Sequence, residues 1–382
     1  MRILHTSDWH IGRTFHGVDL LADQEFALSA IAEIVAVEKV DVVVVAGDVY
    51  DRSIPGADAV LACNRGLERI RAAGAVIVAT PGNHDSAARL GAGAAFAAAG
   101  GLHLRTRVDE LAEPVLLADG SGTVAFYGLP FLEPDVARRA LGVPEARSHV
   151  EILTAAMARV REDLAGRPAG TRSVVLAHAF VVGGEASESE RSISAGGVET
   201  VPASVFGGVD YVALGHLHTP QTLGERIRYS GSPLPYSFGE RSHRKAVWVV
   251  DLDADGAVAV RRMDLPAVRG LSQVIGTLDE LLADPQFADA ENDYVSAVLT
   301  DERRPVDPMR RLKERFPFAV HMEWRRPGGN PELRYSERVR GRSDGEVTRS
   351  FLSDVRGEPT AAELRLVEQA LAQAVSEKET AR

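Results

Sequence analysis

The sequence predicts an α/β protein that carries a second, smaller α/β module. Near the N-terminus, apolar strand-like runs alternate with segments of helical periodicity. These strand-like runs end in short polar segments that contain Asp, Asn or His. Beyond Pro266 the alternation of strand and helix patterns starts again, which indicates a separate module.

The N-terminal part follows the order strand, helix, strand, helix, strand. We expect these elements at residues 2–6, 24–37, 40–46, 55–73 and 75–79. This order favours parallel strands with right-handed crossovers, and ligands gather at the carboxyl ends of such strands. Further strands are predicted at residues 124–129, 173–177 and 211–214, and a helix at residues 151–165. Residues 227–230, 245–250 and 257–261 are expected to form antiparallel strands of a second sheet.

The small module has its own pattern. Strands are predicted at residues 271–275, 294–299 and 319–324, with short helices at residues 278–282 and 309–316. The polar, Arg-rich residues 331–345 indicate a linker or an exposed surface, and Thr360 with Glu363 forms a capping box for a helix that ends near residue 375. We therefore expect three parts, at residues 1–264, 265–330 and 331–382.

Composition leaves several function classes open. The net charge of −11 does not exclude a nucleic-acid partner, because residues 303–342 hold twelve Lys and Arg against five Asp and Glu. The single cysteine, Cys63, rules out an internal disulfide and suits a reducing compartment. No run reaches the roughly 18 apolar residues of a membrane span, and the strand at Met1 does not fit a signal peptide, so we expect a cytoplasmic protein.

Five polar segments contain the residues that could bind metal ions. They are Asp8-x-His10, Gly47-Asp48, Asn83-His84, His178 and His216-x-His218. Side chains two residues apart on an extended segment point the same way, so each pair can converge. Carboxylate, imidazole and amide oxygen suit Mn²⁺, Fe²⁺ or Zn²⁺. Two ions that share Asp48 fit the number of ligands, and two ions about 3.5–4 Å apart suit phosphoryl transfer.

The alternative without a functional role is that each histidine is a structural residue at a strand end, with its hydrogen bonds formed within the protein. That is the commoner role for a lone histidine, but five such segments at one edge of one sheet argue against it.

In this order, the motifs D-x-H, GD-x-x-D-R, GNHD, H and GH-x-H resemble those of the calcineurin-like metallophosphoesterase superfamily, over about residues 1–262. Residues 7–13, 47–55 and 229–240 are similar to a nuclease branch of that superfamily. The resemblance implies a four-layer α+β sandwich, a dimetal phosphodiesterase activity and two divalent ions, expected to be Mn²⁺.

The resemblance also implies roles for single residues. The ligands of one ion would be Asp8, His10, Asp48 and His218, and those of the other Asp48, Asn83, His178 and His216. His84 would protonate the leaving oxygen or orient the phosphate. Asp51 stands where related enzymes carry a histidine, and a buried carboxylate there would raise the pKa of His84. Arg52 could contact phosphate or be a solvated turn residue.

Other polar residues have weaker support. No motif includes His5, His16, His103, His149, His243 or His321. We expect structural or surface roles for them and leave a secondary role open for His16. Asp85 is expected to cap the start of a helix.

The resemblance implies that the module guides DNA over the nuclease site. Its basic residues Arg303, Arg304, Arg310 and Arg311 could follow a DNA backbone, or simply form a solubilising face. The apolar stripe Leu364, Val367, Leu371 and Val375 is expected to dock on an SbcC-like ATPase, or else to pack on its own domain. A homodimer through helices near residues 55–71 and 84–99, within a heterotetramer, is implied as well.

The function hypothesis is therefore a Mn²⁺-dependent DNA nuclease subunit. It would act as a 3′→5′ double-strand exonuclease and a single-strand or hairpin endonuclease at DNA ends, with an ATPase, in DNA replication, repair and recombination at the nucleoid. One alternative is a small-molecule phosphodiesterase or phosphatase, which would need neither the module nor the last helix. Another is a non-catalytic scaffold, which would not need the full ligand set. The sequence leaves the native metal, the cleavage polarity and the ATP dependence open.

Overall fold

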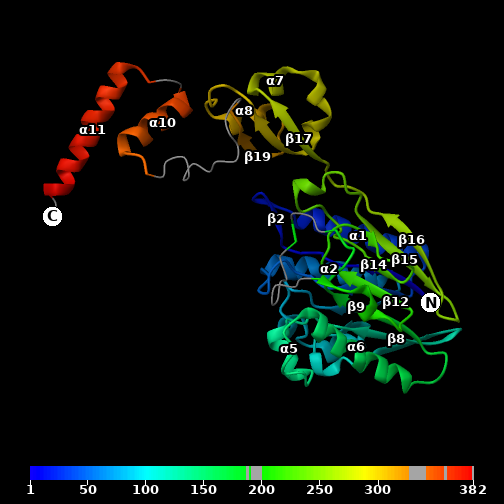
Figure 1. Ribbon diagram of the computed structural model, residues 1–382. Helices are drawn as coiled ribbons and strands as arrows, with labels where there is room; N and C mark the ends of the chain where they lie inside the picture. The colour runs from blue at the N-terminus through cyan, green and yellow to red at the C-terminus, as the bar shows by residue number, and fades with distance from the viewer. Residues whose placement is uncertain (186–188, 191–199, 327–340, 357–358, 381–382) are drawn as a thin grey trace. The chain divides into compact units, whose positions relative to one another are not determined.

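The computed structural model describes residues 1–185, 189–190, 200–326, 341–356 and 359–380 (Figure 1). The chain forms two compact units, Met1–Val268 and Arg269–Arg382. None of the described helices is long and apolar enough to cross a membrane. The expected three-part division stays a prediction.

The first unit contains a six-stranded sheet with the order β16-β15-β1-β4-β5-β6. Its strands are β1 (Arg2–Thr6), β4 (Val42–Ala46), β5 (Val76–Thr80), β6 (Leu102–Leu104), β15 (Ala246–Leu252) and β16 (Val258–Asp264). Strands β1, β4, β5 and β6 are parallel, and β15 and β16 extend the sheet as antiparallel strands.

A second six-stranded sheet has the order β13-β14-β12-β9-β8-β7. Its strands are β7 (Val115–Asp119), β8 (Gly122–Gly128), β9 (Arg172–His178), β12 (Tyr211–Gly215), β13 (Gln221–Thr222) and β14 (Ile227–Tyr229). The four inner strands are parallel, and the two edge strands β7 and β13 are antiparallel to their neighbours.

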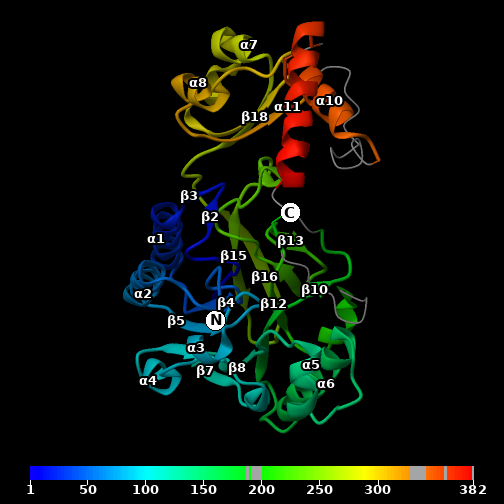
Figure 2. The same ribbon diagram turned by 90° about the vertical axis from the view of Figure 1, so that its left-hand side faces the viewer.

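The two sheets pack face to face, with helices outside. Alternate residues of β4 divide between two cores, because successive side chains of a strand point to opposite faces. Val42 and Val44 face the second sheet, where they meet Val174 and Leu176, whereas Val43 packs toward the helices. Figure 2 shows α1 (Leu21–Glu38) and α2 (Ala57–Ala72) on one side of the sheets, and α5 (Pro134–Ala140) and α6 (His149–Ala165) on the other. The predicted four-layer α/β fold is confirmed.

One prediction of sheet membership is wrong. Residues 245–250 and 257–261 were expected in the second sheet, but as β15 and β16 they extend the first sheet, where β15 pairs with β1. Residues 227–230 do join the second sheet as β14, yet parallel to β12. Hydrophobic periodicity marks β15 as a strand but carries no information about its partner, and β15 instead covers the open edge of β1.

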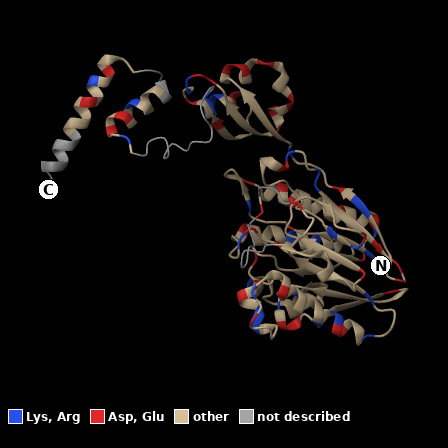
Figure 3. Ribbon diagram, viewed as in Figure 1, with Lys and Arg blue, Asp and Glu red and all other residues tan. Residues whose placement is uncertain are grey.

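The second unit has a three-stranded parallel sheet of β17 (Leu271–Gly276), β18 (Tyr294–Leu299) and β19 (Ala319–Trp324). The helices α7 (Leu278–Ala283) and α8 (Pro308–Arg315) pack on it through an apolar cluster that includes Leu281, Leu312 and Phe316. These elements match the sequence prediction closely. Acidic residues of α7 and basic residues of α8 are seen in Figure 3.

The unit also contains α10 (Asp344–Arg356) and α11 (Ala361–Thr380). Helix α10 was not predicted and begins inside the expected linker, of which residues 331–340 lie outside the described residues. The capping box of α11 is confirmed, because the Glu363 N–H donates to Thr360 Oγ at 3.3 Å and the Thr360 N–H to Glu363 Oε2 at 2.8 Å.

Candidate metal centre

The seven candidate ligands lie where strands of the two sheets end. Asp8 follows β1, Asp48 follows β4 and Asn83 follows β5, while His178 ends β9 and His216 directly follows β12. Six of the seven are at most 4% exposed: Asp8, His10, Asp48, His178, His216 and His218. Asn83 is half-buried. Parallel strands of both sheets therefore bring all five polar segments to one buried place, as expected for such sheets.

The backbone at these positions is unusual. Asp8, His10, Asp48 and His216 have φ values of 52°, 44°, 51° and 106°. Non-glycine residues rarely adopt positive φ, and such strain is held only where the surrounding structure imposes it.

Two glycines allow the segments to approach one another. A Cβ on Gly47 would lie 2.3 Å from His178 Nδ1, and a Cβ on Gly82 would lie 2.1 Å from Asp48 Oδ1. Neither space can hold a methyl group without displacing the candidate ligand. The glycines of the GD and GNHD motifs are thus required by close packing.

Asp48 is the central carboxylate. Its Oδ2 lies 3.6 Å from His10 Nε2 and 3.4 Å from His178 Nε2. Its Oδ1 accepts the backbone N–H of His84 at 2.9 Å. Asp48 is therefore within reach of both groups of ligands, as expected of a shared carboxylate.

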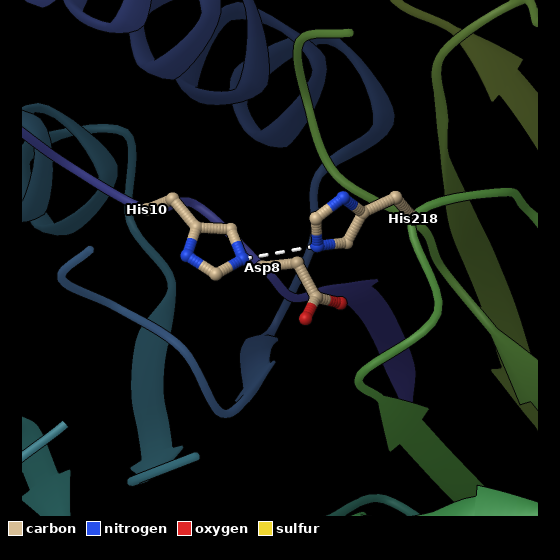
Figure 4. Close-up of side chains that lie close together, drawn as sticks. All are labelled: Asp8, His10 and His218. Carbon is tan, nitrogen blue, oxygen red and sulfur yellow. Dashed lines mark hydrogen bonds between the residues drawn. The ribbon is translucent and has the colours of Figure 1, made fainter. Parts of the chain in front are cut away.

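The first group is Asp8, His10 and His218 (Figure 4). The Nε2 atoms of His10 and His218 face each other at 3.0 Å, near the Asp8 carboxylate. That carboxylate also accepts the backbone N–H of His216 at 3.0 Å. These contacts join residues more than 200 positions apart in the chain.

The second group is formed around His178. Its Nδ1 lies 3.0 Å from the Ala46 carbonyl oxygen and acts as the donor, which directs Nε2 to the Asn83 Oδ1 at 2.9 Å. The rings of His178 and His216 lie 5.4 Å apart, edge to face. This group therefore presents an imidazole nitrogen and an amide oxygen to the same point.

Burial dominates the electrostatics of the centre. It lowers the pKa of His10 well below its ordinary value and that of His216 to about 3. It raises the pKa of Asp8 to about 6. For His178, burial also disfavours the charged form, but the Asp48 and Asp8 carboxylates and the hydrogen bond to Ala46 together outweigh burial and raise the pKa to about 9. His10 and His216 are thus neutral near pH 7, the form in which imidazole binds a metal.

The residues present fit divalent cations. Three overlapping triads place carboxylate and imidazole ligand atoms within 4.8 Å of one another: Asp8–His10–His218, His10–Asp48–His84 and Asp8–Asp48–His178. Such a set of nitrogen and oxygen donors suits Mn²⁺, Fe²⁺ or Zn²⁺.

The ring of His84 contacts the backbone of Asp51 more closely than the Asp51 side chain. His84 Nδ1 lies 2.8 Å from the backbone carbonyl oxygen of Asp51, whereas the Asp51 carboxylate is 4.0 Å away and its side chain is 17% exposed. The turn after β4 therefore presents the carbonyl closer to the ring than the carboxylate, and the role expected of the Asp51 carboxylate stays a prediction. Arg52 is 78% exposed, with its Nε 3.6 Å from Asp51 Oδ2.

Asp85 does not cap a helix, contrary to the prediction. Its carboxylate accepts the backbone N–H groups of Val49, Tyr50 and Gly82 at 2.9–3.0 Å. Asp85 thereby fastens the segment after β4 to the segment after β5. Ser86 caps the short helix α3 (Ala87–Leu90) instead.

The remaining predicted residues belong to the second unit. Arg303 and Arg304 are exposed in the segment before α8. Arg310 pairs with Glu314 at 3.0 Å and Arg311 with Asp279 at 2.9 Å, so neighbouring carboxylates offset these two charges. Leu364, Val367 and Leu371 are half-buried on α11, while the side chain of Val375 lies outside the described residues.

Most of the other histidines are in structural contacts. His5 is buried between the Tyr211 hydroxyl and the Leu214 carbonyl, at 3.0 and 3.1 Å, and burial lowers its pKa to about 3. His243 contacts Thr219, and His321 contacts Ser296. His16 packs on the rings of Phe15 and Phe238, His149 on that of Phe131, and His103 lies in β6.

Sequence reasoning missed several residues that support the ligands. Gln24 donates to the His10 carbonyl at 2.8 Å, and Lys245 donates to the His218 carbonyl at 2.7 Å. Glu240 is 1% exposed and lies 3.8 Å from His218 Nδ1. The available signal was a charged residue at the end of the 229–240 motif, but nothing in the sequence showed that it would be buried.

The fold and the buried centre define a metal-dependent phosphoesterase. Residues 1–220 match the calcineurin-like phosphoesterase family, and the chain belongs to that family. Residues 265–356 match a second family, described as the type 5 capsule protein repressor C-terminal domain. The expected enzyme class, a dimetal phosphodiesterase, is confirmed.

Two curated relatives bear the name of the SbcD subunit of the SbcCD nuclease. That of Staphylococcus epidermidis is 29% identical over 319 residues, which is 83% of this chain and 83% of the relative. That of Staphylococcus saprophyticus is 28% identical over 361 residues, 94% of each. Among solved structures, a dimetal phosphatase from Danio rerio is 13% identical and covers 69% of this chain and 96% of its own, with a TM-score of 0.42. The suspected resemblance to this nuclease subunit is confirmed.

Proposed function

We propose that the protein is the nuclease subunit of a two-component DNA-processing complex. The observation that carries this proposal is the joint presence of seven candidate ligands, six of them buried, and a second unit of the kind matched in residues 265–356. The similarity to the SbcD subunit of the SbcCD nuclease extends over both units. A small-molecule phosphodiesterase would use the first unit alone.

Two Mn²⁺ ions are the proposed cofactors. Asp8, His10, Asp48 and His218 would hold one ion, and Asp48, Asn83, His178 and His216 the other. When bound, the ions would supply charge to stabilise the phosphate and would lower the pKa of a bound water. The chain's own part is to exclude bulk water from the ligands and to keep His10 and His216 neutral.

His84 is the proposed proton donor. In the reaction, a water oxygen forms a bond to phosphorus, the bond between phosphorus and a sugar oxygen breaks, and that oxygen takes a proton. The Asp51 carbonyl accepts the Nδ1–H of His84, and Nε2 of the ring lies toward the metal centre, 4.0 Å from Asp48 Oδ2. A protonated ring can donate from Nε2 to the leaving oxygen or to a phosphate oxygen.

The finer features of the proposal concern substrates and partners. We propose exonuclease activity in the 3′→5′ direction on double strands, and endonuclease activity on single strands and hairpins. An SbcC-like ATPase would bind the stripe on α11, two copies of each subunit would form a heterotetramer, and the complex would work at DNA ends on the nucleoid. The three parts at residues 1–264, 265–330 and 331–382 would serve cleavage, DNA guidance and ATPase binding. Arg52, Arg303 and Arg304 would contact phosphates.

A single assay distinguishes the candidate functions. Purified protein with Mn²⁺ is given hairpin DNA and, separately, bis-p-nitrophenyl phosphate, with and without the ATPase partner and ATP. DNA cleavage that is abolished in His84→Gln while Mn²⁺ binding remains supports the proposal. Hydrolysis of the small diester alone, under every condition, would show a small-molecule phosphodiesterase. No hydrolysis of either substrate, despite partner binding, would show a scaffold.

A further inference from the structure

We propose that Glu240 and Lys245 form a buried ion pair that positions His218 for metal binding. The inference rests on the proposed metal centre and assigns two positioning residues to it. Of the candidate ligands, both residues contact His218, through its carbonyl oxygen and its Nδ1 side, so both would act through this residue.

The pair is buried and fully engaged. Glu240 is 1% exposed and Lys245 is 6% exposed. The Lys245 ammonium donates to Glu240 Oε2, to Ser232 Oγ at 3.0 Å and to the His218 carbonyl oxygen at 2.7 Å. Removing two charges from water is costly, so an apolar pair of similar volume would often be at least as stable. The pair is therefore poorly explained by stability alone.

A second route joins Glu240 to the imidazole. Glu240 Oε1 accepts from Ser189 Oγ at 2.5 Å, and Ser189 Oγ lies 2.5 Å from His218 Nδ1. With the Ser189 proton directed to Glu240, the serine oxygen accepts the Nδ1–H of His218. The proton then stays on Nδ1, and Nε2 faces His10 with its lone pair. Histidine ligands commonly donate their second N–H to such a partner, which fixes the tautomer and the ring orientation.

Different residues orient the histidines of the first and the second group of candidate ligands. Lys245 holds the backbone of His218 and Glu240 holds its ring through Ser189, whereas the His178 ring is held by the Ala46 carbonyl at 3.0 Å. Loss of the ion pair should therefore affect only the ion held by Asp8, His10 and His218. A general loss of stability would affect both ions alike.

The test measures Mn²⁺ binding to the metal-free full-length protein by the EPR signal of free Mn²⁺. The wild type should bind two ions. In Glu240→Gln, the Mn²⁺ affinity of the site formed by Asp8, His10 and His218 should fall about 10–100-fold, and the Mn²⁺ affinity of the other site should not change. The double variant Glu240→Gln/Lys245→Met removes both charges of the pair, so neither is left buried without its partner. It should therefore fold, as checked by circular dichroism. The Mn²⁺ affinity of the same single site should fall in this variant.

A matched control is Asp119→Asn, which breaks the ion pair between Asp119 and the 2%-exposed Arg172 at the other end of β9. It should lower stability with both Mn²⁺ affinities unchanged. In addition, ¹⁵N NMR of histidine-labelled, metal-free protein should show His218 protonated at Nδ1 in the wild type and a mixture of tautomers in Glu240→Gln.

Three results would overturn the inference: a folded double variant with wild-type affinity at both sites, equal weakening of both sites, or a wild-type His218 protonated at Nε2. If the wild type binds no Mn²⁺, the proposed metal centre fails. The NMR measurement still decides the positioning of His218 in that case, because it uses no metal.

Discussion

His84 Nδ1 lies 2.8 Å from the main-chain oxygen of Asp51, and 4.0 Å from the carboxylate of the same residue. The hydrogen bond that orients the ring therefore belongs to the backbone. A change of the residue-51 side chain leaves this bond in place, whereas a change of His84 removes the group that faces the centre. The activity should thus be much more sensitive to a change of His84 than to a change of the Asp51 side chain.

We expect His84→Gln to lower kcat for DNA cleavage about 10²–10⁴-fold, the usual effect of losing a general acid. Asp51→Asn should lower it less than about tenfold, because the carbonyl still accepts the His84 N–H. Steady-state cleavage of hairpin DNA at saturating Mn²⁺ measures both values. Equal decreases in the two variants would show that the Asp51 carboxylate acts directly.

Asp48 should be needed for both ions and Asn83 for one. Asp48 Oδ2 lies 3.6 Å from His10 Nε2 and 3.4 Å from His178 Nε2, whereas Asn83 Oδ1 contacts only the His178 side. We expect Asp48→Asn to abolish binding of two Mn²⁺ ions and Asn83→Ala to leave one. Equilibrium dialysis with metal analysis measures the number of Mn²⁺ ions bound per chain. Retention of a full-affinity ion in Asp48→Asn would argue against a shared carboxylate.

The ion pair of Asp119 and Arg172 should stabilise the first unit in a pH-dependent way. Arg172 is 2% exposed and also donates to the carbonyls of Leu252 and Asp253, which ties the second sheet to the end of β15. Asp119→Asn should lower the free energy of unfolding by about 3 kcal/mol near pH 7, at the low end for a buried pair because Asp119 is 20% exposed. Urea denaturation checks the value.

The sign of the pH dependence follows from the pKa of Asp119, which the Arg172 hydrogen bond holds well below its ordinary value. The stabilisation is present above pH about 4, the value for an unfolded Asp, and is lost as the pH falls toward the folded pKa. The difference in the free energy of unfolding between the wild type and Asp119→Asn should therefore become smaller below that pH. The exposed pair Arg107–Asp109 is the control, and Asp109→Asn should leave the free energy of unfolding nearly unchanged because solvent screens this pair.

DNA affinity should depend on Arg303 and Arg304 more than on the arginines that carboxylates already offset. The double variant Arg303→Ser/Arg304→Ser should reduce the slope of log K against log salt by about 0.9 for each phosphate that it no longer neutralises. Arg311→Ser should change the slope less, because Asp279 already offsets this charge at 2.9 Å. Fluorescence anisotropy at several salt concentrations measures the slopes. Equal slopes for the wild type and both variants would favour the solubilising role.

The sequence predicted the core of the site because each part of it is locally encoded. The run Val42–Ala46 is apolar on both faces, and Gly47-Asp48 follows it directly. Parallel strands then place such segments at one edge without further information. The proximity of the candidate ligands could be inferred for this reason before any contact was known.

The features that were missed depend on contacts between distant segments. Strand β15 pairs with β1, some 245 residues away, and periodicity alone cannot choose that partner. Glu240 is buried because Lys245 and Ser189 meet it, and Asp85 accepts backbone N–H groups from another loop. The Asp51 carbonyl contact likewise depends on the turn geometry rather than on residue type.

The left-handed backbone at Asp8, His10, Asp48 and His216 has a consequence for how this protein tolerates change. Each such conformation costs on the order of 1–3 kcal/mol, and glycine would adopt it without that strain. Glycine at any of these positions would relieve the backbone strain while removing a candidate metal ligand. Variants with glycine at one of these positions could therefore gain stability and lose metal binding together.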